Sequence, residues 1–480
     1  MTDIPSSRPP ASSPHRPIIR FGTDGWRAVM AEEFTFANVR RVAWALAQWI
    51  HQNAAGHPVY VGYDRRFGSR RFAEEAASVL AGAGVETRFS ADVLPTPAFS
   101  YLCKKNAAYA LVVTASHNPP MHNGLKIKTP DGASAPASLT REIEALVEQA
   151  PEDFEKIRFL ADGTLRKQYL GYLMSFAKKV RAKIGRRKIV VDYFHGSGAG
   201  FLEEILGQGR VIALRKERDP EFGGIAPEPV EKNLEELKKT VCRSRAFLGV
   251  ALDGDGDRFA MVDDKGRYLT PAVVFPMFVY YLALHRKEKG EIVQGVSLGY
   301  LGEQIASKAG LPFTWVPVGF KNIAERMISQ NVLLGGEESG GYALGRALPD
   351  RDGSLNALVM LELLLELKTT PSSLVREIFK QFGASCYERF DIHLTKPIDP
   401  GFLKNSAADE LFAKLDREEF RLANKLTIDG LKAFFEDGSW LLLRPSGTEP
   451  LVRVYAETSS RQQTRKLLEI ASTWVREKIK

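Results

Sequence analysis

Apolar residues recur along the chain with helical spacings and short strand-like runs in alternation. Residues 39–50 and 70–83 carry apolar positions three and four apart and predict helices. The apolar runs 58–63 and 109–114 predict buried strands between them. Such alternation is typical of α/β layers with mostly parallel strands.

The same pattern continues through two further units before the chain changes character. A strand at 188–192, a glycine-rich turn and a strand at 247–252 are predicted for the second unit, which opens near Tyr169. The last unit is shorter, with a strand at 440–443 and a helix from about Ser460, and it has an α+β character.

Length and composition narrow the class of protein. A chain of 480 residues is too long for one core and predicts three or four domains. Apolar residues at 44% and charged residues at 26% exclude wholesale disorder and fibrous repeats. The longest apolar stretch, 271–284, contains Pro276 and falls short of a membrane span, so we expect a buried helix there. Cys103, Cys242 and Cys386 lie far apart, which favours a reducing cytoplasm.

The net charge of +8 suits an anionic substrate as well as it suits nucleic acid. Lys and Arg are spread along the chain without a basic stripe or an aromatic platform, so we expect no nucleic-acid partner. The Pro- and Ser-rich segment 1–17 lacks the apolar run of a secretory signal and is interpreted as a disordered leader.

Polar or glycine-rich loops follow four of the apolar strands. In open α/β sheets, ligands bind beyond the carboxyl ends of strands, so loops from different units can meet in one cleft. The first loop, 114–120 (TASHNPP), carries Ser116 and His117, and Lys126 follows after a turn. A serine at an exposed tip is a candidate nucleophile when a base or charge partner activates it. The local sequence also fits an ordinary polar turn.

The second loop, 253–258 (DGDGDR), alternates carboxylates with glycines. The glycines let the backbone curl so that Asp253, Asp255 and Asp257 can converge on one point. Converging carboxylates need a cation, and oxygen ligands favour a hard ion such as Mg²⁺, which we prefer to a solvated acidic turn. Arg258 adds a fork suited to a phosphate or a carboxylate.

The third and fourth loops offer groups that bind a phosphorylated sugar. Loop 335–341 (GGEESGG) sets carboxylates and a hydroxyl on a pliable backbone, which suits sugar hydroxyls and equally suits a flexible acidic turn. Loop 444–450 (RPSGTEP) offers successive backbone N–H groups, hydroxyls and arginine charge, a candidate cradle for a dianion. Together the four loops supply what phosphoryl transfer requires.

In this order the motifs resemble those of the α-D-phosphohexomutases, the superfamily of phosphoglucomutases and phosphomannomutases. The likeness begins near residue 18, includes 21–27 (FGTDGWR) as the N-terminal signature, and covers nearly all of the chain. It implies three mixed α/β domains of similar core and a smaller C-terminal α+β domain around a central cleft. With the leader at 1–17, the expected domains are 18–155 with the active-site serine, 156–266 with the metal loop, 267–375 with the sugar loop and 376–480 with the phosphate-binding loop.

The resemblance also implies a role for each candidate residue. Ser116 would be the phosphoserine of the resting enzyme and would bind Mg²⁺ together with Asp253, Asp255 and Asp257. Lys126 would act as general base or acid. The residues implied near the transferring phosphoryl group are His117, Arg27 and Arg258, and those implied to bind substrate are Lys321, Glu337, Ser339, Arg351, Arg444, Ser446, Gly447, Thr448 and Arg453.

The implied reaction interconverts glucose 1-phosphate and glucose 6-phosphate through a hexose 1,6-bisphosphate, with glucose 1,6-bisphosphate as activator. Glucose is favoured over dual glucose and mannose specificity because Gly341 stands where dual-specificity members and glucosamine-phosphate mutases usually carry a nearby histidine. Arg351 stands where many relatives carry lysine, and the two cations differ in geometry.

Other classes remain open at this point. A metal-dependent sugar phosphatase would use Asp253 or Asp255 as its nucleophile and release inorganic phosphate. A non-catalytic phosphosugar binder would keep the fold without turnover, although it would not need Ser116 together with the metal loop. We expect hexose phosphates as partners, no membrane, and a monomer or homodimer.

Overall fold

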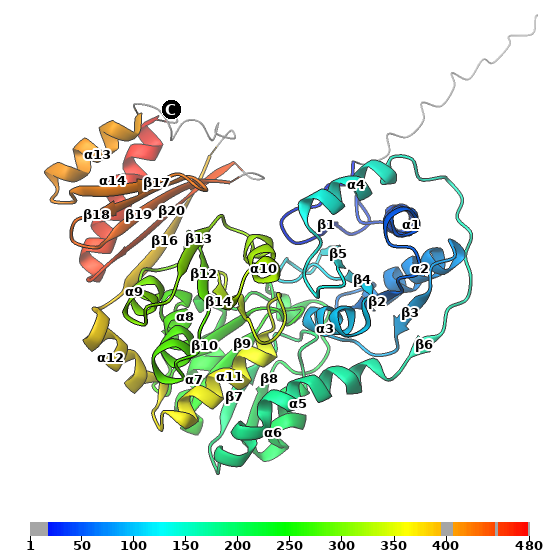
Figure 1. Cartoon of the computed structure of the whole chain (residues 1–480), viewed down its shortest axis with the longest axis horizontal. Coiled ribbons are helices and arrows are strands. Elements are labelled where there is room, and N and C mark those ends of the chain that lie inside the picture. Colours follow the sequence, from blue (N-terminus) through cyan, green and yellow to red (C-terminus); the bar gives the residue numbers. More distant parts are fainter. Residues whose placement is uncertain (1–17, 395–406, 447–449, 479–480) are drawn as a thin grey trace, which may run out of the picture.

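The computed structural model describes residues 18–394, 407–446 and 450–478. The predicted leader 1–17 and the candidate residues Gly447 and Thr448 lie outside these ranges. Within the described residues the strands form four sheets, each with helices packed against it (Figure 1). The first three units are mixed α/β and the fourth is α+β, which confirms the predicted fold class.

The first unit is a mixed sheet with helices on both faces. Its strands, in spatial order, are β1 (Trp26–Val29), β5 (His122–Lys128), β4 (Tyr109–Val113), β2 (Val59–Tyr63), β3 (Thr87–Ser90) and β6 (Ala161–Asp162). Its helices are α1 (Phe36–Asn53), α2 (Ser69–Gly82), α3 (Thr96–Asn106) and α4 (Ala137–Val147). Alternate residues of β2 enter two different cores, Val61 toward α1 and α2 and Tyr60 toward α3, as expected for a strand covered on both faces.

The second unit repeats this architecture with parallel strands at its centre. Its strands, in order, are β11 (Tyr268–Leu269), β10 (Phe259–Val262), β9 (Leu248–Leu252), β7 (Ile189–Asp192) and β8 (Val211–Leu214). Its helices are α5 (Leu165–Lys183), α6 (Phe201–Leu206) and α7 (Glu235–Ser244). Strands β9, β7 and β8 run parallel, so the loops after β7 and β9 leave the same edge of the sheet.

The third unit contains the apolar stretch that was predicted to be a buried helix. That stretch forms α8 (Pro271–Val279) and a π-helical segment (Tyr280–His285). No helix in the ranges that the structure describes has the length and apolar character to cross a membrane. The strands, in order, are β13 (Phe313–Val316), β12 (Glu291–Gly295), β14 (Val332–Gly336) and β15 (Tyr342–Leu344). The other helices are α9 (Leu301–Lys308), α10 (Phe320–Ser329), α11 (Gly353–Glu366) and α12 (Pro371–Phe382).

The fourth unit is an antiparallel sheet with two helices, joined to the third by β16, the strand that leads out of α12 (Figure 1). Its strands, in order, are β16 (Cys386–His393), β20 (Leu451–Thr458), β19 (Trp440–Pro445), β18 (Leu431–Phe435) and β17 (Leu422–Leu426), and its helices are α13 (Ala407–Arg417) and α14 (Arg461–Lys478). It has a hydrophobic core of its own, whereas one continuous core runs through the second and third units and reaches α3 of the first.

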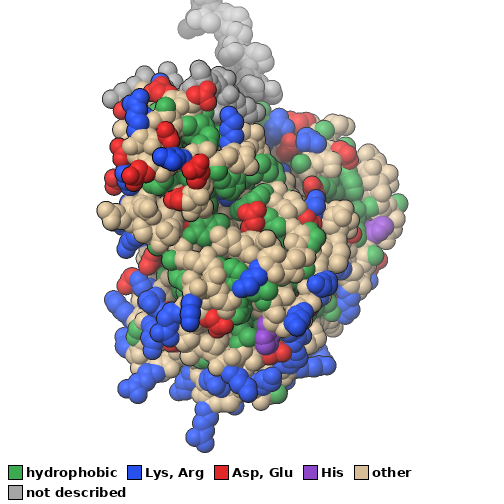
Figure 2. Space-filling model, turned by 60° about the vertical axis from the view of Figure 1, so that its left-hand side comes forward, with side chains coloured by type: hydrophobic (Ala, Val, Ile, Leu, Met, Phe, Trp, Pro, Cys, Tyr) green, Lys and Arg blue, Asp and Glu red, His purple; other side chains and the backbone are tan. Residues whose placement is uncertain are grey.

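Lys and Arg side chains gather on one part of the surface. Lys and Arg lie over the lower part of the face shown in Figure 2, with single Asp and Glu side chains between them. Two of the large apolar side chains that are exposed, Phe67 and Leu160, lie far apart in the sequence. The basic residues on this face agree in sign with the net charge of +8, and the candidate chemistry lies where the polar loops meet.

Candidate active site

Ser116 lies at the carboxyl end of β4, in a backbone conformation that residues other than glycine rarely adopt. Its φ is 50°, in the left-handed region, and its side chain is 1% exposed. Its backbone N–H donates to Thr114 Oγ1 at 2.9 Å, and its Oγ donates to Asp253 Oδ2 at 2.8 Å. The predicted meeting of the serine loop and the metal loop is therefore present in the structure.

The aspartates of the metal loop converge as the alternation with glycine predicted. Asp253, Asp255 and Asp257 each bring a carboxylate oxygen within 4.8 Å of the others, and all three side chains are buried. Burial raises the pKa of Asp253 well above its usual range, and repulsion from the other two adds to this. The Oδ1 atoms of Asp255 and Asp257 are buried acceptors without a hydrogen-bond partner among the described residues. An all-oxygen, acidic set with orphaned acceptors fits a hard divalent cation such as Mg²⁺.

Lys126 returns to this site because β5 runs antiparallel to β4. Its Nζ lies 2.7 Å from Asp24 Oδ2, 2.8 Å from Asp255 Oδ2 and 2.9 Å from Asp257 Oδ2. Burial would lower the pKa of Lys126, but the three carboxylates outweigh burial and raise it. In this arrangement the side chain is an ammonium that balances part of the acidic charge.

Arg351 joins loops from three units. Its Nη2 donates to Asp24 Oδ2 at 2.6 Å and to Asp257 Oδ2 at 2.7 Å, and its Nη1 donates to Glu337 Oε1 at 3.1 Å. Ser339 Oγ donates to the same Glu337 oxygen at 2.6 Å. The sugar loop is thus tied to the metal loop, and the terminal nitrogens of Arg351 face carboxylates rather than an open space for substrate.

Arg27 and Arg258 lie beside the serine loop, which also carries His117. His117 Nδ1 lies 3.4 Å from Ser116 Oγ, and Arg27 Nη1 donates to Asn118 Oδ1 at 2.8 Å. Burial lowers the pKa of His117 well below its usual range, and the charges of Arg258 and Arg27 lower it further. The imidazole is therefore neutral at neutral pH. Two arginine charges beside a buried serine suit an anionic group at this point.

The fourth unit contacts the site through two carboxylates. Glu338 accepts a hydrogen bond from Tyr455 Oη at 3.2 Å. Asp429 accepts from Arg444 Nε at 2.8 Å and from Val318 N at 3.0 Å, which places the phosphate loop beside the segment leading to Lys321 in the first turn of α10. Arg444 of β19 lies opposite Arg453 of β20, and Ser446 N donates to Leu451 O at 2.9 Å. The serine, metal and sugar loops therefore meet as predicted, whereas the described part of the fourth loop contacts the segment before α10 through Asp429, and its place at the site stays a prediction.

Sequence reasoning did not single out three residues that contact this site. Asp24 accepts from Ser134, Lys126 and Arg351, and Thr96 Oγ1 donates to Asp255 Oδ2 at 2.6 Å. Arg66 Nη2 donates to the backbone carbonyl of Ser116 in the serine loop. The signal for Arg66 was present, because it follows β2, a strand that is parallel to β4 and ends at the same edge.

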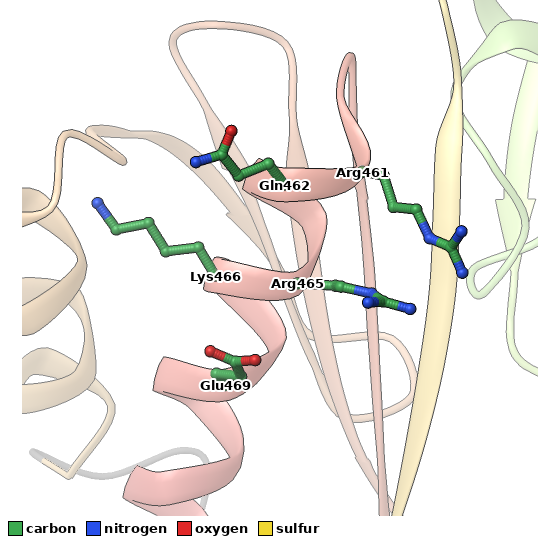
Figure 3. A pocket seen from close by; sticks show the side chains of 5 residues that line it. All are labelled: Arg461, Gln462, Arg465, Lys466 and Glu469. Carbon is green, nitrogen blue, oxygen red and sulfur yellow. The ribbon is translucent and has the colours of Figure 1, made fainter.

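A separate hollow of about 520 Å³ lies on α14 and is lined by Arg461, Gln462, Arg465, Lys466 and Glu469 (Figure 3). Arg461 and Arg465 extend toward β16, where both contact Glu388, whereas Lys466 extends the other way and contacts Glu418 (Figure 3). The cations of this hollow are paired and do not converge, so it does not compete with the serine and aspartate site.

Comparison with known proteins agrees with this geometry. The four domain models of the phosphoglucomutase/phosphomannomutase family match residues 19–153, 167–266, 273–382 and 403–471. A phosphoglucomutase/phosphomannomutase of Thermococcus kodakarensis is 29% identical over 96% of this chain and 99% of its own length. A probable phosphoglucosamine mutase of Methanothermobacter thermautotrophicus is 31% identical over 93% of this chain and 95% of its own.

A solved structure leads to the same group of proteins. The crystal structure of a putative phosphomannomutase from Thermus thermophilus superposes with a TM-score of 0.84, at 30% identity, over 96% of this chain and 100% of the other. The relatives are named for different hexoses. The chain belongs to the phosphoglucomutase/phosphomannomutase family.

Proposed function

We propose that this protein interconverts glucose 1-phosphate and glucose 6-phosphate, with Ser116 as the residue that stores the phosphoryl group. The observation that carries the proposal is the 2.8 Å contact between Ser116 Oγ and Asp253, inside a buried trio of carboxylates. A hydroxyl beside a divalent-ion site, flanked by Arg27 and Arg258, has the surroundings that a phosphoryl donor and acceptor requires.

The reaction has two transfers. In the first, the bond between phosphorus and Ser116 Oγ breaks and a bond to the free hydroxyl of the sugar phosphate forms, which produces a 1,6-bisphosphate. In the second, the other phosphoryl group of the bisphosphate returns to Ser116. Mg²⁺ held by the three aspartates and Ser116 would stabilise the negative charge that develops on the transferring group.

The residues of the chain supply the remaining steps. Lys126 is the candidate acid or base for the proton that the sugar hydroxyl loses and the serine oxygen gains. Glu337 and Ser339 present acceptor and donor groups to sugar hydroxyls, with Lys321 close to the cleft. The phosphate that does not react is assigned to Arg444, Ser446, Gly447, Thr448 and Arg453. Closure of the cleft would exclude water, which would otherwise take the phosphoryl group.

The preference for glucose is supported by the packing of Gly341. A Cβ atom at this position would lie 2.2 Å from Arg351 Cδ, so a larger residue would displace Arg351 from Glu337 and Asp257. The arrangement therefore differs from one with a histidine in this loop. Mannose and glucosamine phosphates remain the second candidates, because relatives carry those names.

The test is a panel of substrates. The purified protein is incubated with Mg²⁺, a trace of glucose 1,6-bisphosphate, and the 1-phosphate of glucose, mannose or glucosamine in separate reactions. We expect glucose 6-phosphate to appear fastest and chelation of Mg²⁺ to stop the reaction. Steady release of inorganic phosphate would indicate a phosphatase instead, and binding without turnover would indicate a phosphosugar binder.

The role of Ser116 is tested in the same assay. Ser116→Ala should lower the rate to background, and a phosphopeptide from the wild-type protein should map to Ser116. Ser175→Ala, on the exposed face of α5, is the matched control and should leave the rate unchanged. Full activity of Ser116→Ala would refute the proposed phosphoserine.

A further inference from the structure

The backbone of the serine loop converges on one buried guanidinium group. Arg66 Nη2 donates to Ser116 O at 2.6 Å and to Asn118 O at 2.7 Å. Arg66 Nη1 donates to Pro119 O at 2.9 Å and to His122 O at 3.1 Å. Its two terminal nitrogens thus serve four carbonyl oxygens of a single loop.

Arg66 is itself held in place from two sides. The side chain is completely buried, and its Nε lies 3.3 Å from Asp64 Oδ2. Phe222 of the second unit covers the guanidinium, with the ring centroid 4.9 Å from Cζ. Asp64 is fixed in turn, because its Oδ1 accepts from Ser69 Oγ at 2.7 Å and its N–H donates to Val113 O at the end of β4. The arginine therefore has little freedom to reorient.

The contacts of Arg66 supply hydrogen-bond donors to carbonyl groups of the serine loop. Ser116 is buried and its carbonyl group lies outside the strand ladder, where leaving it without a donor is costly, whereas the carbonyl of Pro119 also accepts from His122 N. Ser116 also occupies the left-handed region, a conformation that persists only when the surroundings impose it. Since its planar fork offers several fixed donors, arginine can hold several carbonyls at once, which lysine cannot do.

The same contacts place two groups of the candidate site. Holding the Ser116 carbonyl sets the direction of its Oγ, which meets Asp253. Holding the Asn118 carbonyl sets the position of the Asn118 side chain, whose Oδ1 accepts from Arg27. Arg66 touches neither of these functional atoms directly, so its effect on them passes through the backbone.

We propose that Arg66 is a positioning residue for phosphoryl transfer: by holding the carbonyls of Ser116, Asn118, Pro119 and His122, it aims Ser116 Oγ at the aspartate trio and fixes Arg27 through Asn118. The proposal rests on the proposed function, in which Ser116 carries the phosphoryl group. According to this proposal, the geometry of the serine loop depends on a residue in the loop that follows a different strand, β2.

The first test is Arg66→Lys in the full-length protein. The lysine keeps the charge but loses the fork, so we expect kcat to fall about 100-fold, as a displacement near 1 Å does, with KM within about twofold of the wild type. Arg70→Lys, an exposed arginine paired with Glu74, is the matched control and should behave as the wild type. A kcat of Arg66→Lys within twofold of the wild type would overturn the proposal.

The second test is Arg66→Ala with and without added methylguanidinium, at a temperature where circular dichroism shows a folded protein. We expect kcat to recover severalfold as methylguanidinium rises through the low millimolar range, with no such rise for the wild type or Ser116→Ala. Absence of rescue in a folded variant would overturn the proposal, and so would failure of both Arg66 variants to fold. If the wild-type protein converts no sugar phosphate, the proposed function fails, and that result is seen without any Arg66 variant.

Discussion

Ser116 combines a strained backbone with tight surroundings. Its positive φ costs about 1 kcal/mol or more, and the structure holds it there through Thr114, through Arg66 and through a close approach of the metal loop. Gly254 lies against the Ser116 carbonyl: a Cβ atom on Gly254 would be 2.5 Å from that oxygen. The two loops therefore need a residue without a side chain at their meeting point.

Gly254→Ala tests this contact. The added methyl group has to push the Ser116 carbonyl away, so we expect kcat to fall about 100-fold and the free energy of unfolding to fall by about 1–3 kcal/mol. Steady-state kinetics and urea unfolding measure the two effects. The control is Gly171→Ala in α5, where a Cβ atom would meet nothing within 4 Å. It should keep full activity and leave stability unchanged or slightly higher. Equal activity of the two variants would show that Gly254 and the Ser116 carbonyl are not packed as tightly as the structure indicates.

Sequence reasoning reached the residues whose type indicates chemistry and missed Arg66 and Asp24, which hold other residues of the site in place. Residue type and a position near the end of an apolar strand indicated Ser116, Lys126 and the aspartates as candidates. Arg66 and Asp24 act through partners far away in the sequence, such as the carbonyl of residue 116 or the guanidinium of residue 351. Such partners are fixed only when the sheets assemble, so a local pattern can indicate the edge of the sheet at which Arg66 lies but not the groups that it contacts.

At the scale of elements, periodicity predicts the long helices and the buried strands well. Residues 39–50 were predicted to be helical and lie within α1, and the predicted strand 188–192 contains β7. Very short strands such as β6 and β11 carry no periodicity, because two residues give no pattern. Their pairing depends on which neighbour the tertiary fold brings alongside, as β6 shows by joining β3 of the first sheet from beyond residue 155.

Helix α11 begins with a buried carboxyl group that is expected to make stability depend on pH. Asp352 caps α11 by accepting from Leu355 N at 2.9 Å, and Tyr169 Oη donates to both of its oxygens at 3.0 Å. Burial raises the pKa of Asp352 to about 7, and the hydrogen bonds from Leu355 and Tyr169 do not cancel this. A carboxyl group with a folded-state pKa above its unfolded value favours the folded state fully at acidic pH, and this contribution is lost as pH rises through 7.

Asp352→Asn removes the ionisation and keeps an acceptor for the cap. The Tm of the variant relative to the wild type should therefore increase between about pH 4 and pH 8. The upper limit is about 4 kcal/mol, from roughly three pKa units at 1.36 kcal/mol each. Calorimetry across this range measures the difference, and Asp153→Asn, an exposed carboxylate between the first two units, serves as control. A pH-independent difference between Asp352→Asn and the wild type would contradict the expectation.

At the scale of the whole molecule, the fourth unit has a core of its own and meets the third unit in a small buried cluster formed by Val296, Trp440, Leu442 and Tyr455. Lys432 of β18 is completely buried where the third and fourth units meet. Its Nζ donates to Val296 O at 2.8 Å and lies 3.8 Å from the ring centroids of Trp315 and Trp440. Nearby, Glu457 accepts from Tyr300 N at 2.8 Å. The sequence predicted a fourth unit but not this packing, because a lone lysine in a strand resembles an exposed residue.

The fourth unit carries Arg444 and Ser446, so its attachment should determine how well the unreactive phosphate is held. Burial lowers the pKa of Lys432 to about 7, so its amino group is partly protonated at neutral pH. Lys432→Met keeps the approximate length of the side chain but loses the donor to Val296 and this partial charge between the two tryptophans. We expect the contact to weaken by about 2–4 kcal/mol, from an unpaired buried carbonyl and a lost cation–π interaction. Calorimetry should then show the fourth unit unfolding before the others, and KM for the sugar phosphate should rise more than kcat falls. Lys425→Met, on the exposed neighbouring strand β17, should change neither. A single transition with an unchanged KM would mean that the covalent link and the remaining contacts alone hold the fourth unit over the cleft.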